Sequence, residues 1–336
     1  MNLLDLPEEI LFMIAEELEE KEILQLVCTS QYLHGLLLSE SLYKRNIKAG
    51  ASALLWCAEK GVESTARQLL SLNANINVRS SFYEQTPLTL AVQKRHYSIV
   101  ELLLDHKADV NLSETSNATA LHSAAENGDE KMVHILLRHG ADINSTNHFA
   151  ETPLCLAAYE GHCGVINILL DHGAIMGFPN LDMDHLAYEC WFPPLHAAVE
   201  EFEEGNKSTA ALELLISRGA EVDMLDGNGE TALHWAASFG ANAMVQALLD
   251  HGADINRPNI DGKTALHIAS EQTEQVDTIR ILLDRGADWR LTTMTGLTPL
   301  QVAKESGHED NVGLFERHIA SFDSLLAEEL ETNNVS

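Results

Sequence analysis

The sequence predicts an all-α protein in which a small three-helix module precedes a solenoid of about eight helix-turn-helix repeats with short β-like fingers. Three observations lead to this fold class. One unit recurs at near-constant spacing over residues 51–320. Its copies carry residues typical of helix starts and helix ends at matching positions. The first forty-odd residues share none of that pattern and have an amphipathic pattern of their own.

Residues 1–47 contain three apolar runs separated by polar breaks. The first run begins with Leu6 and Pro7, and proline is well suited to the first turn of a helix. The apolar positions of the first two runs include Leu6, Pro7, Ile10, Ile14, Leu24 and Val27. A module of this size buries little apolar surface, so we expect it to rest on a partner or on the first repeat.

The repeated unit is anchored by the sequence T-P-L-H-x-A or a near variant of it. The anchors start at Ser52, Thr86, Thr119, Thr152, Pro193, Thr231, Thr264 and Thr298, at intervals of 34, 33, 33, 41, 38, 33 and 34 residues. Most anchors are followed by a turn, a V-x-x-L-L run and the sequence G-A-D-x-N. Such a period predicts stacked units, because one unit alone cannot bury its own apolar face.

Each recurring residue has a physical role. Threonine caps the first helix of a unit, and proline fits the first turn because its missing N–H costs nothing there. Gly128 and Gly240 lie at the turn between the two helices, where a positive φ favours glycine. Val133, Leu136 and Leu137 form the apolar stripe of a second helix. The pattern therefore predicts a helix pair followed by an extended finger in every unit.

The unit resembles the ankyrin repeat, and its first and last copies are degenerate, as end units tend to be. The N-terminal pattern L-P-x-E-I-x-x-x-I-x-x-x-L resembles an F-box, and its junction with the repeats is similar to that of fungal F-box and ankyrin-repeat proteins. The resemblance implies an F-box-like module over 1–47, repeats over 51–320, and a closing helix with a tail over 321–336. It also implies that Leu6, Pro7, Ile10, Ile14, Leu24 and Val27 bind the Skp-type subunit of a cullin–RING ubiquitin ligase.

Two functions remain open at this stage. In the first, the chain is the substrate receptor of such a ligase and holds a protein target on its repeats. In the second, it is a scaffold or inhibitor, and the N-terminal helices only cap the array. An enzyme is disfavoured because the sequence lacks G-x-S-x-G, P-loop and Rossmann motifs, and no cofactor is expected.

The resemblance places target binding on the concave face, which is built by finger tips and the exposed side of each first helix. The candidates by position are Phe82, Tyr83, His148, Phe149 and Trp191 on fingers, and Glu126, Tyr159, Glu160 and Phe239 on helices. Glutamates around central aromatic residues favour a basic target with an apolar anchor. Glutamate is also common on exposed helices because of its propensity, so this pattern has an ordinary explanation as well.

Two longer intervals place insertions at 177–192 and 200–210. Insertions in repeat arrays map to loops that often lie on the binding face. The first insertion is rich in aromatic residues, including Tyr188, Trp191 and Phe192, which either pack back on the array or anchor a partner.

The charge, the histidines and the cysteines limit which kinds of partner and which compartment are expected. Lys and Arg number 21 against 51 Asp and Glu, a net charge of −30, which disfavours nucleic acid and anionic membranes and favours a monomer. Eleven of the sixteen histidines occupy recurring slots of the repeat, so we interpret them as framework and expect no metal site. The five cysteines form no C-x-x-C pair, which indicates a reducing compartment, cytoplasmic or nuclear.

Overall fold

The computed structural model describes residues 47–80, 83–177, 193–199, 208–273 and 275–333. The six predicted ligase-subunit contacts, from Leu6 to Val27, lie outside these residues, as do Phe82, Trp191 and most of both insertions. The chain divides into two compact units, unit 1 over residues 1–148 and unit 2 over residues 149–336. The two units are described separately.

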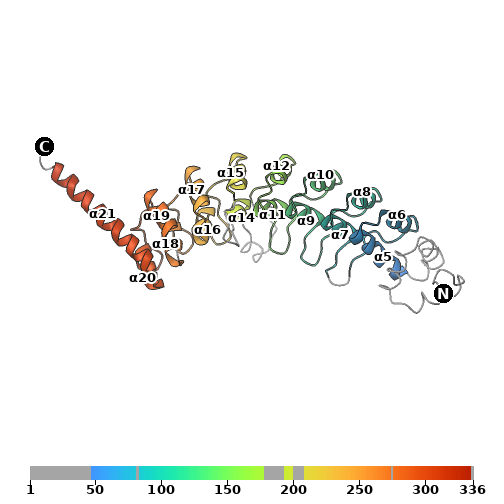
Figure 1. Ribbon diagram of the computed structural model, residues 1–336, viewed down its shortest axis with the longest axis horizontal. Helices are drawn as coiled ribbons and strands as arrows, with labels where there is room; N and C mark the ends of the chain where they lie inside the picture. Colours follow the sequence, from blue (N-terminus) through green and yellow to red (C-terminus); the bar gives the residue numbers. More distant parts are fainter. Residues whose placement is uncertain (1–46, 81–82, 178–192, 200–207, 274, 334–336) are drawn as a thin grey trace, which may run out of the picture. The chain divides into compact units, whose positions relative to one another are not determined.

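Unit 1 contains three helix pairs within its described residues (Figure 1). The helices are α5 (Ile47–Lys60), α6 (Glu63–Ser71), α7 (Pro87–Gln93), α8 (Tyr97–Asp105), α9 (Ala120–Glu126) and α10 (Glu130–Arg138). The first helices α5, α7 and α9 pack side by side in one row, and α6 packs against α8 in the second row. Each described repeat of unit 1 therefore contributes one helix to each of two layers.

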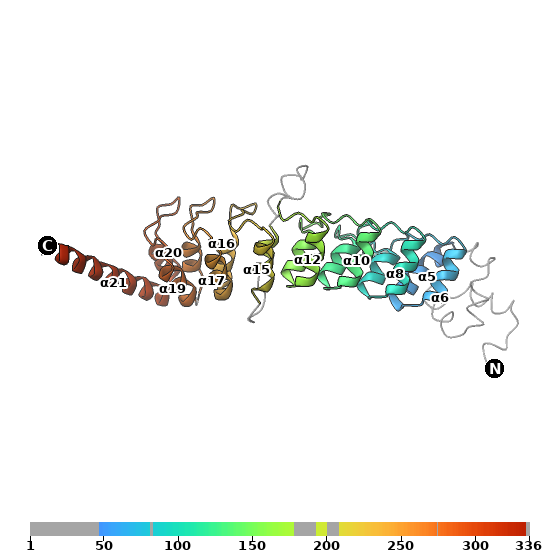
Figure 2. The ribbon, with the colours of Figure 1, turned by 90° about the horizontal axis from the view of Figure 1, so that it is seen from above.

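Unit 2 continues the same pattern (Figures 1 and 2). Its helices are α11 (Pro153–Tyr159), α12 (Cys163–Asp171), α14 (Pro194–Val199), α15 (Ala210–Ser217), α16 (Ala232–Phe239), α17 (Asn242–Asp250), α18 (Ala265–Glu271), α19 (Val276–Asp284), α20 (Pro299–Ser306) and α21 (Glu309–Asn333). The first helices α11, α14, α16, α18 and α20 pack in sequence, each against the next. The all-helical prediction is confirmed for the described residues.

Six of the described first helices, α7, α9, α11, α16, α18 and α20, begin after a threonine that caps them. The Thr86 hydroxyl accepts a hydrogen bond from the Thr89 N–H at 3.1 Å, and the Thr152 hydroxyl accepts one from the Cys155 N–H at 3.2 Å. Proline follows both caps at the first helical position. The threonine–proline anchor thus satisfies one orphan N–H of the helix and removes another.

In three repeats a histidine of the anchor binds its own cap. Nδ1 of His122, His234 and His267 accepts the backbone N–H of the threonine three residues earlier, at 3.1 Å in each case. The opposite ring nitrogen of His234 donates to the Lys263 carbonyl at 3.1 Å, and that of His267 donates to the Leu297 carbonyl at 3.2 Å. These carbonyls belong to the next finger, so each ring ties its helix start to the following repeat.

His196 occupies the same slot but lacks half of these contacts. Its Nε2 donates to the Glu230 carbonyl at 3.0 Å, whereas no donor among the described residues reaches its Nδ1. The residue three positions earlier is Pro193, which has neither an N–H nor a hydroxyl. Burial lowers the pKa of His196 to about 4, since the ring is closed off from water.

The core is built from short aliphatic residues between the two rows. In α10, Met132, Val133, Ile135 and Leu136 are buried, whereas Leu137 of the predicted stripe is only half-buried. The anchors contribute paired alanines, such as Ala124 and Ala125, that are fully enclosed. Small residues let adjacent helices approach closely, and Gly128 and Gly240 reverse the chain between helices with φ of 67° and 68°.

The fingers are connected by a ladder of side-chain amides and carboxylates. In unit 1, Oδ1 of Asn77 accepts the Asp109 N–H at 3.0 Å, and Oδ1 of Asn111 accepts the Asp142 N–H at 2.8 Å. In unit 2, Asn256 accepts the Asp288 N–H at 2.9 Å. The described fingers consist of turns and contain no β-strand, so the predicted β-like character is limited to isolated backbone hydrogen bonds.

Helix α21 is much longer than the other second helices. It has 25 residues, whereas α19 has nine, and it extends past α19 and α20 (Figure 1). The domain boundary expected near residue 320 falls inside this helix. The last repeat and the closing helix are therefore one continuous element.

Candidate target-binding surface

The candidates of unit 1 that the structure describes, Tyr83, Glu126 and His148, are exposed. The Tyr83 side chain is 67% exposed, and its carbonyl accepts the Thr115 N–H of the next finger at 2.9 Å. His148 is likewise exposed, with its N–H bonded to the Ser116 carbonyl at 2.9 Å. Glu126 is exposed at the end of α9. These side chains come from successive repeats and do not converge on one point.

The candidates of unit 2 fall in two places. Phe149 is 66% exposed, and Tyr159 and Glu160 lie at the end of α11, half-buried and exposed respectively. Phe239 ends α16 and is 42% exposed. Helix α14 packs between α11 and α16, so Tyr159 and Phe239 belong to separate parts of the surface.

An aromatic cluster that sequence reasoning missed surrounds Phe239. Trp235 lies one turn earlier on α16, with its ring 6.3 Å from that of Phe239 in an edge-on arrangement. The indole N–H of Trp235 donates to Oδ2 of Asp226 at 3.1 Å, which fixes the ring. The Trp235 and His196 rings also meet edge-on, with their centroids 5.4 Å apart. Trp235 lies inside the recurring anchor, so the sequence alone suggests a residue that only packs within the repeat. Its contacts in the structure show that it supports the exposed ring of Phe239.

Asp226 holds the finger that leads into α16. Its Oδ1 accepts the backbone N–H groups of Asn228 and Glu230, at 2.9 and 2.8 Å, and the residue is buried. In the next repeat Asn259 has the same role, accepting from Asp261 and Lys263 at 3.0 Å each. The sequence could have indicated these finger-holding residues, because Asp226 and Asn259 each lie five residues before an anchor threonine.

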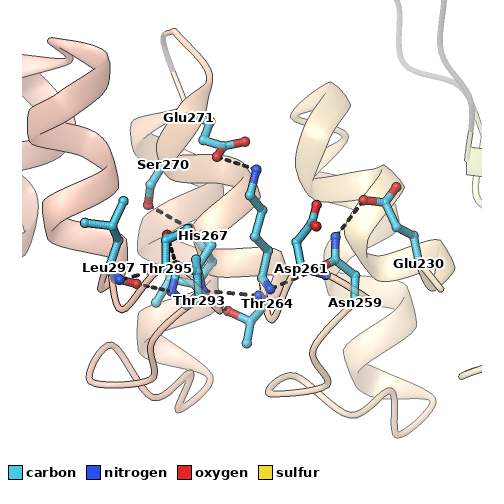
Figure 3. Close-up of polar contacts among 12 residues, drawn as sticks. Glu230, Asn259, Asp261, Thr264, His267, Ser270, Glu271, Thr293, Thr295 and Leu297 are labelled. Carbon is cyan, nitrogen blue, oxygen red and sulfur yellow. Dashed lines mark hydrogen bonds and ion pairs between the residues drawn. The ribbon is translucent and has the colours of Figure 1, made fainter. Parts of the chain in front are cut away.

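The Glu230 carboxylate lies beside this cluster and contacts the next repeat. Its Oε1 accepts a hydrogen bond from the Asn259 side-chain amide at 3.0 Å (Figure 3). Burial raises the pKa of Glu230; the Asn259 hydrogen bond and the charge of Lys263 lower it, and the Asp226 and Asp261 carboxylates raise it. The site thus holds a half-buried carboxylate among like charges.

Lys263 could neutralise Glu230 but is engaged elsewhere. Its ammonium group lies 2.7 Å from the carboxylate of Glu271, the last residue of α18. The side chains of Lys263 and Glu271 are 29% and 33% exposed, so the pair is partly screened by water. Glu230 forms no ion pair within the described part of the chain.

Unit 1 has a related arrangement around Glu114, in which glutamine amides donate to the carboxylate. Glu114 stands where unit 2 has Asp226 and Asn259, and it accepts hydrogen bonds from Gln93 at 2.8 Å and Gln85 at 3.4 Å. Burial raises the pKa of Glu114, and these amides lower it. Two glutamine side chains therefore surround the carboxylate in unit 1, where unit 2 presents carboxylates and aromatic rings.

The described residues contain no group of three His, Cys, Asp or Glu side chains arranged to hold a metal ion. Among the same residues, no helix combines the length and apolar character needed to span a bilayer. The surface offers hydrogen bonds, charge and exposed rings, which are the means by which proteins bind other proteins.

Comparison with known proteins identifies a family and solved structures with a similar fold. The family profile described as "Ankyrin repeats (3 copies)" matches residues 11–114, 108–180 and 195–293. The crystal structure of the human ASB11 ankyrin repeat domain is similar, with 25% identity and a TM-score of 0.58. That match covers 69% of this chain and 98% of the ASB11 domain.

Proposed function

Since this chain belongs to the ankyrin-repeat family, whose repeats are a scaffold for binding proteins, we propose that it is the substrate receptor of an SCF-type cullin–RING ubiquitin ligase. In this proposal the repeats hold a protein target and residues 1–47 bind the Skp-type subunit. The chain carries out no chemistry itself and acts by raising the effective concentration of the target near the ligase.

The single observation behind the ligase role is the apolar pattern at the start of the chain. Leu6, Pro7 and Ile10 begin a short helix in the sequence pattern, followed by Ile14, Leu24 and Val27. Apolar side chains on so small a module require a partner surface. The described repeats supply the other half of the proposal, because they present exposed side chains such as Tyr83, Phe149 and Phe239.

A second function is favoured by a specific observation. The first match to the ankyrin-repeat profile begins at residue 11, inside the segment assigned to the F-box. That start is what one expects if the N-terminal helices are a degenerate repeat that caps the array. The chain would then be a scaffold or an inhibitor without a ligase partner.

Binding to a purified Skp-type subunit separates the two functions. The receptor role predicts stable binding by the full chain and its loss, by at least fifty-fold in affinity, in the double variant Leu6→Asp, Ile10→Asp. The capping role predicts no binding in either protein, and a drop in the stability of the first repeats in the variant. Hydrogen exchange over α5 and α6 measures that drop directly. The single variants Glu16→Gln and Glu20→Gln, on the polar positions of the segment, are the matched controls.

A further inference from the structure

Charge is distributed very unevenly along the chain. Residues 1–46 contain 3 Lys and Arg against 9 Asp and Glu, a net charge of −6, and residues 47–148 contain 9 against 11, a net charge of −2. Residues 149–336 contain 9 Lys and Arg against 31 Asp and Glu, a net charge of −22. Solubility needs only a modest net charge spread over the surface. The concentration of acid in unit 2 indicates where a cationic partner is attracted.

The cations of unit 2 do little to reduce this field at the α16 surface. Arg218, Arg285 and Arg290 lie in ion pairs with Asp171, Asp250 and Asp288, all at the outer helix ends and finger starts. The positive charge of Lys263 acts on Glu230, but its ammonium group is held by Glu271 at 2.7 Å. A half-buried carboxylate with like charges beside it gains from any cation that arrives from outside.

Exposed aromatic surface lies next to this carboxylate. Phe239 is 42% exposed, and its position is fixed by the edge-on contact with Trp235, whose N–H is bonded to Asp226. A rigid ring of this kind anchors a partner side chain at low entropic cost. Glu230 precedes α16 and Phe239 ends it, so one helix sets the spacing between the charged and the apolar contact.

We propose that Glu230, Asn259, Trp235, Phe239 and Glu271 form the docking surface for an extended basic segment of the protein target. An arginine or lysine of the segment pairs with Glu230, and an apolar side chain packs on Phe239. The eight residues of α16 span about 12 Å, and an extended chain advances about 3.3 Å per residue. The basic and the apolar residue of the segment therefore stand about four positions apart.

This inference deepens the proposed function, since it names the chemistry of the target, but it does not depend on the ligase role. The surface is made by unit 2 alone, and residues 1–47 take no part in it. A failed Skp-type interaction leaves the docking surface intact, and a failed docking surface leaves the Skp-type interaction intact. The two results are therefore distinguishable.

The test begins with a library of random twelve-residue peptides displayed on phage and selected on the full chain. We expect enrichment of peptides that carry Arg or Lys three to five positions from Leu, Ile, Met or an aromatic residue. The strongest sequence is then made as a fluorescein-labelled peptide, and its affinity is measured by anisotropy at 50 and 300 mM salt. Binding should weaken at the higher salt, because the contact at Glu230 is electrostatic.

Variants assign the binding to the surface. Glu230→Gln keeps an acceptor for Asn259 and removes the charge, and Phe239→Ser removes the ring; each should weaken the peptide at least tenfold. Lys263→Met removes the competing cation and should strengthen binding several-fold, a gain that misfolding cannot produce. The controls Glu221→Gln and Met294→Ser change an exposed charge and an exposed apolar residue elsewhere in unit 2, and should stay within twofold.

The proposal is overturned if the selection yields no binder or yields acidic binders. It is also overturned if Glu230→Gln and Phe239→Ser both leave the affinity within twofold of the unaltered chain. Circular dichroism melts of each variant, compared with the unaltered chain, show whether a loss of binding comes from a loss of fold. Should Phe239→Ser melt early, the gain in Lys263→Met and the loss in Glu230→Gln decide the result.

Discussion

The fingers of unit 1 and the last three fingers of unit 2 make the same left-handed turn with different residues. Two positions before the anchor threonine, unit 1 has Glu84 and Asn117, with φ of 53° and 60°. The last three fingers of unit 2 have Gly229, Gly262 and Gly296 there, with φ of 70°, 75° and 82°. Because a side chain in this region is strained, the non-glycine residues of unit 1 require compensation.

Unit 1 supplies that compensation through side-chain contacts. The Asn117 amide donates to the Thr146 carbonyl of the next finger at 2.8 Å, and Glu84 pairs with Arg79 at 2.7 Å. In unit 2 a Cβ at two of the glycine positions would come closer than 3.0 Å to the next finger. A Cβ on Gly229 would lie 2.7 Å from Cγ2 of Ile260, and a Cβ on Gly262 would lie 2.9 Å from the Met294 backbone nitrogen. Every one of these fingers therefore has the same left-handed backbone two residues before the anchor threonine. The distance to the next finger decides whether that position can hold a side chain or needs glycine.

The largest effect that tests this comparison is expected from Gly262→Ala. The methyl group meets backbone atoms of Met294 and Thr293, which cannot rotate away, and the residue also keeps a strained φ. We expect a loss of about 3 kcal/mol in the free energy of unfolding, measured by urea denaturation. Gly296→Ala is the matched control: nothing lies within 4 Å of its Cβ, so only the conformational cost of about 1 kcal/mol remains. Equal losses in the two variants would contradict the role given to finger spacing.

A second effect concerns pH and the buried histidines of unit 2. Burial lowers the pKa of His196 to about 4 and also lowers the pKa values of His234 and His267. A folded pKa below the unfolded value means that the unfolded chain binds protons more readily. The contribution of these neutral histidines to the free energy of unfolding is therefore fully present above about pH 6.5 and is lost as the pH falls toward 4. His196 alone accounts for a loss of about 3 kcal/mol.

Urea denaturation of the full chain between pH 7.5 and 4.5 measures this slope. His196→Gln keeps a donor for the Glu230 carbonyl and removes the titration, so its slope should be clearly smaller. The raised pKa of Glu230 acts in the opposite direction, because it favours the protonated folded form, but it is common to both proteins. An unchanged slope in the variant would show that His196 is reached by water in solution.

A smaller effect is expected from restoring the missing cap at Pro193. In the repeats that begin at Thr119, Thr231 and Thr264 the threonine supplies the N–H that the histidine accepts. Pro193→Thr supplies the same N–H to Nδ1 of His196, and Pro194 already holds the first helical position, as Pro87 does in α7. We expect a gain of about 1 kcal/mol in the free energy of unfolding. In a His196→Leu background the restored N–H has no side-chain acceptor, so Pro193→Thr should give a clearly smaller gain there, and an equal gain would point to another cause. Glutamine is unsuitable at this position, because Gln301 accepts the Thr298 N–H at 2.8 Å in the equivalent slot.

The smallest effect is expected from Asn117→Gly in unit 1. Glycine relieves the left-handed strain but loses the hydrogen bond to the Thr146 carbonyl, and these changes nearly cancel. The free energy of unfolding should change by no more than about 0.5 kcal/mol. Hydrogen exchange of the finger amides near residues 113–118 provides the more sensitive measurement. A loss in stability as large as that of Gly262→Ala would mean that the hydrogen bond from Asn117 to Thr146 stabilises the finger by more than the left-handed strain costs.

Much of the repeat structure could be predicted from residues with a local role. Thr86 and Thr152 cap helices because their hydroxyls reach an N–H three residues later, and this needs no knowledge of the neighbours. The interpretation of the anchor histidines as framework follows the same logic, although their bond to the next finger was not foreseen. The contact between Trp235 and Phe239, and the hydrogen bond from Trp235 to Asp226, could not be predicted from the sequence. Asp226 lies on a finger and the two rings lie on α16, and adjacent repeats set how this finger packs on the helix.

The sequence by itself determined the repeated helix pair, its period and the placement of its turns, since these depend on contacts within a few residues along the chain. Only the tertiary structure decided that Gly262 cannot carry a side chain and that Lys263 pairs with Glu271 in place of Glu230. Each of these depends on atoms about 30 residues apart or on a competition between two partners. Periodicity specifies which repeats stack, but the distances between their side chains decide which groups are left to bind another protein.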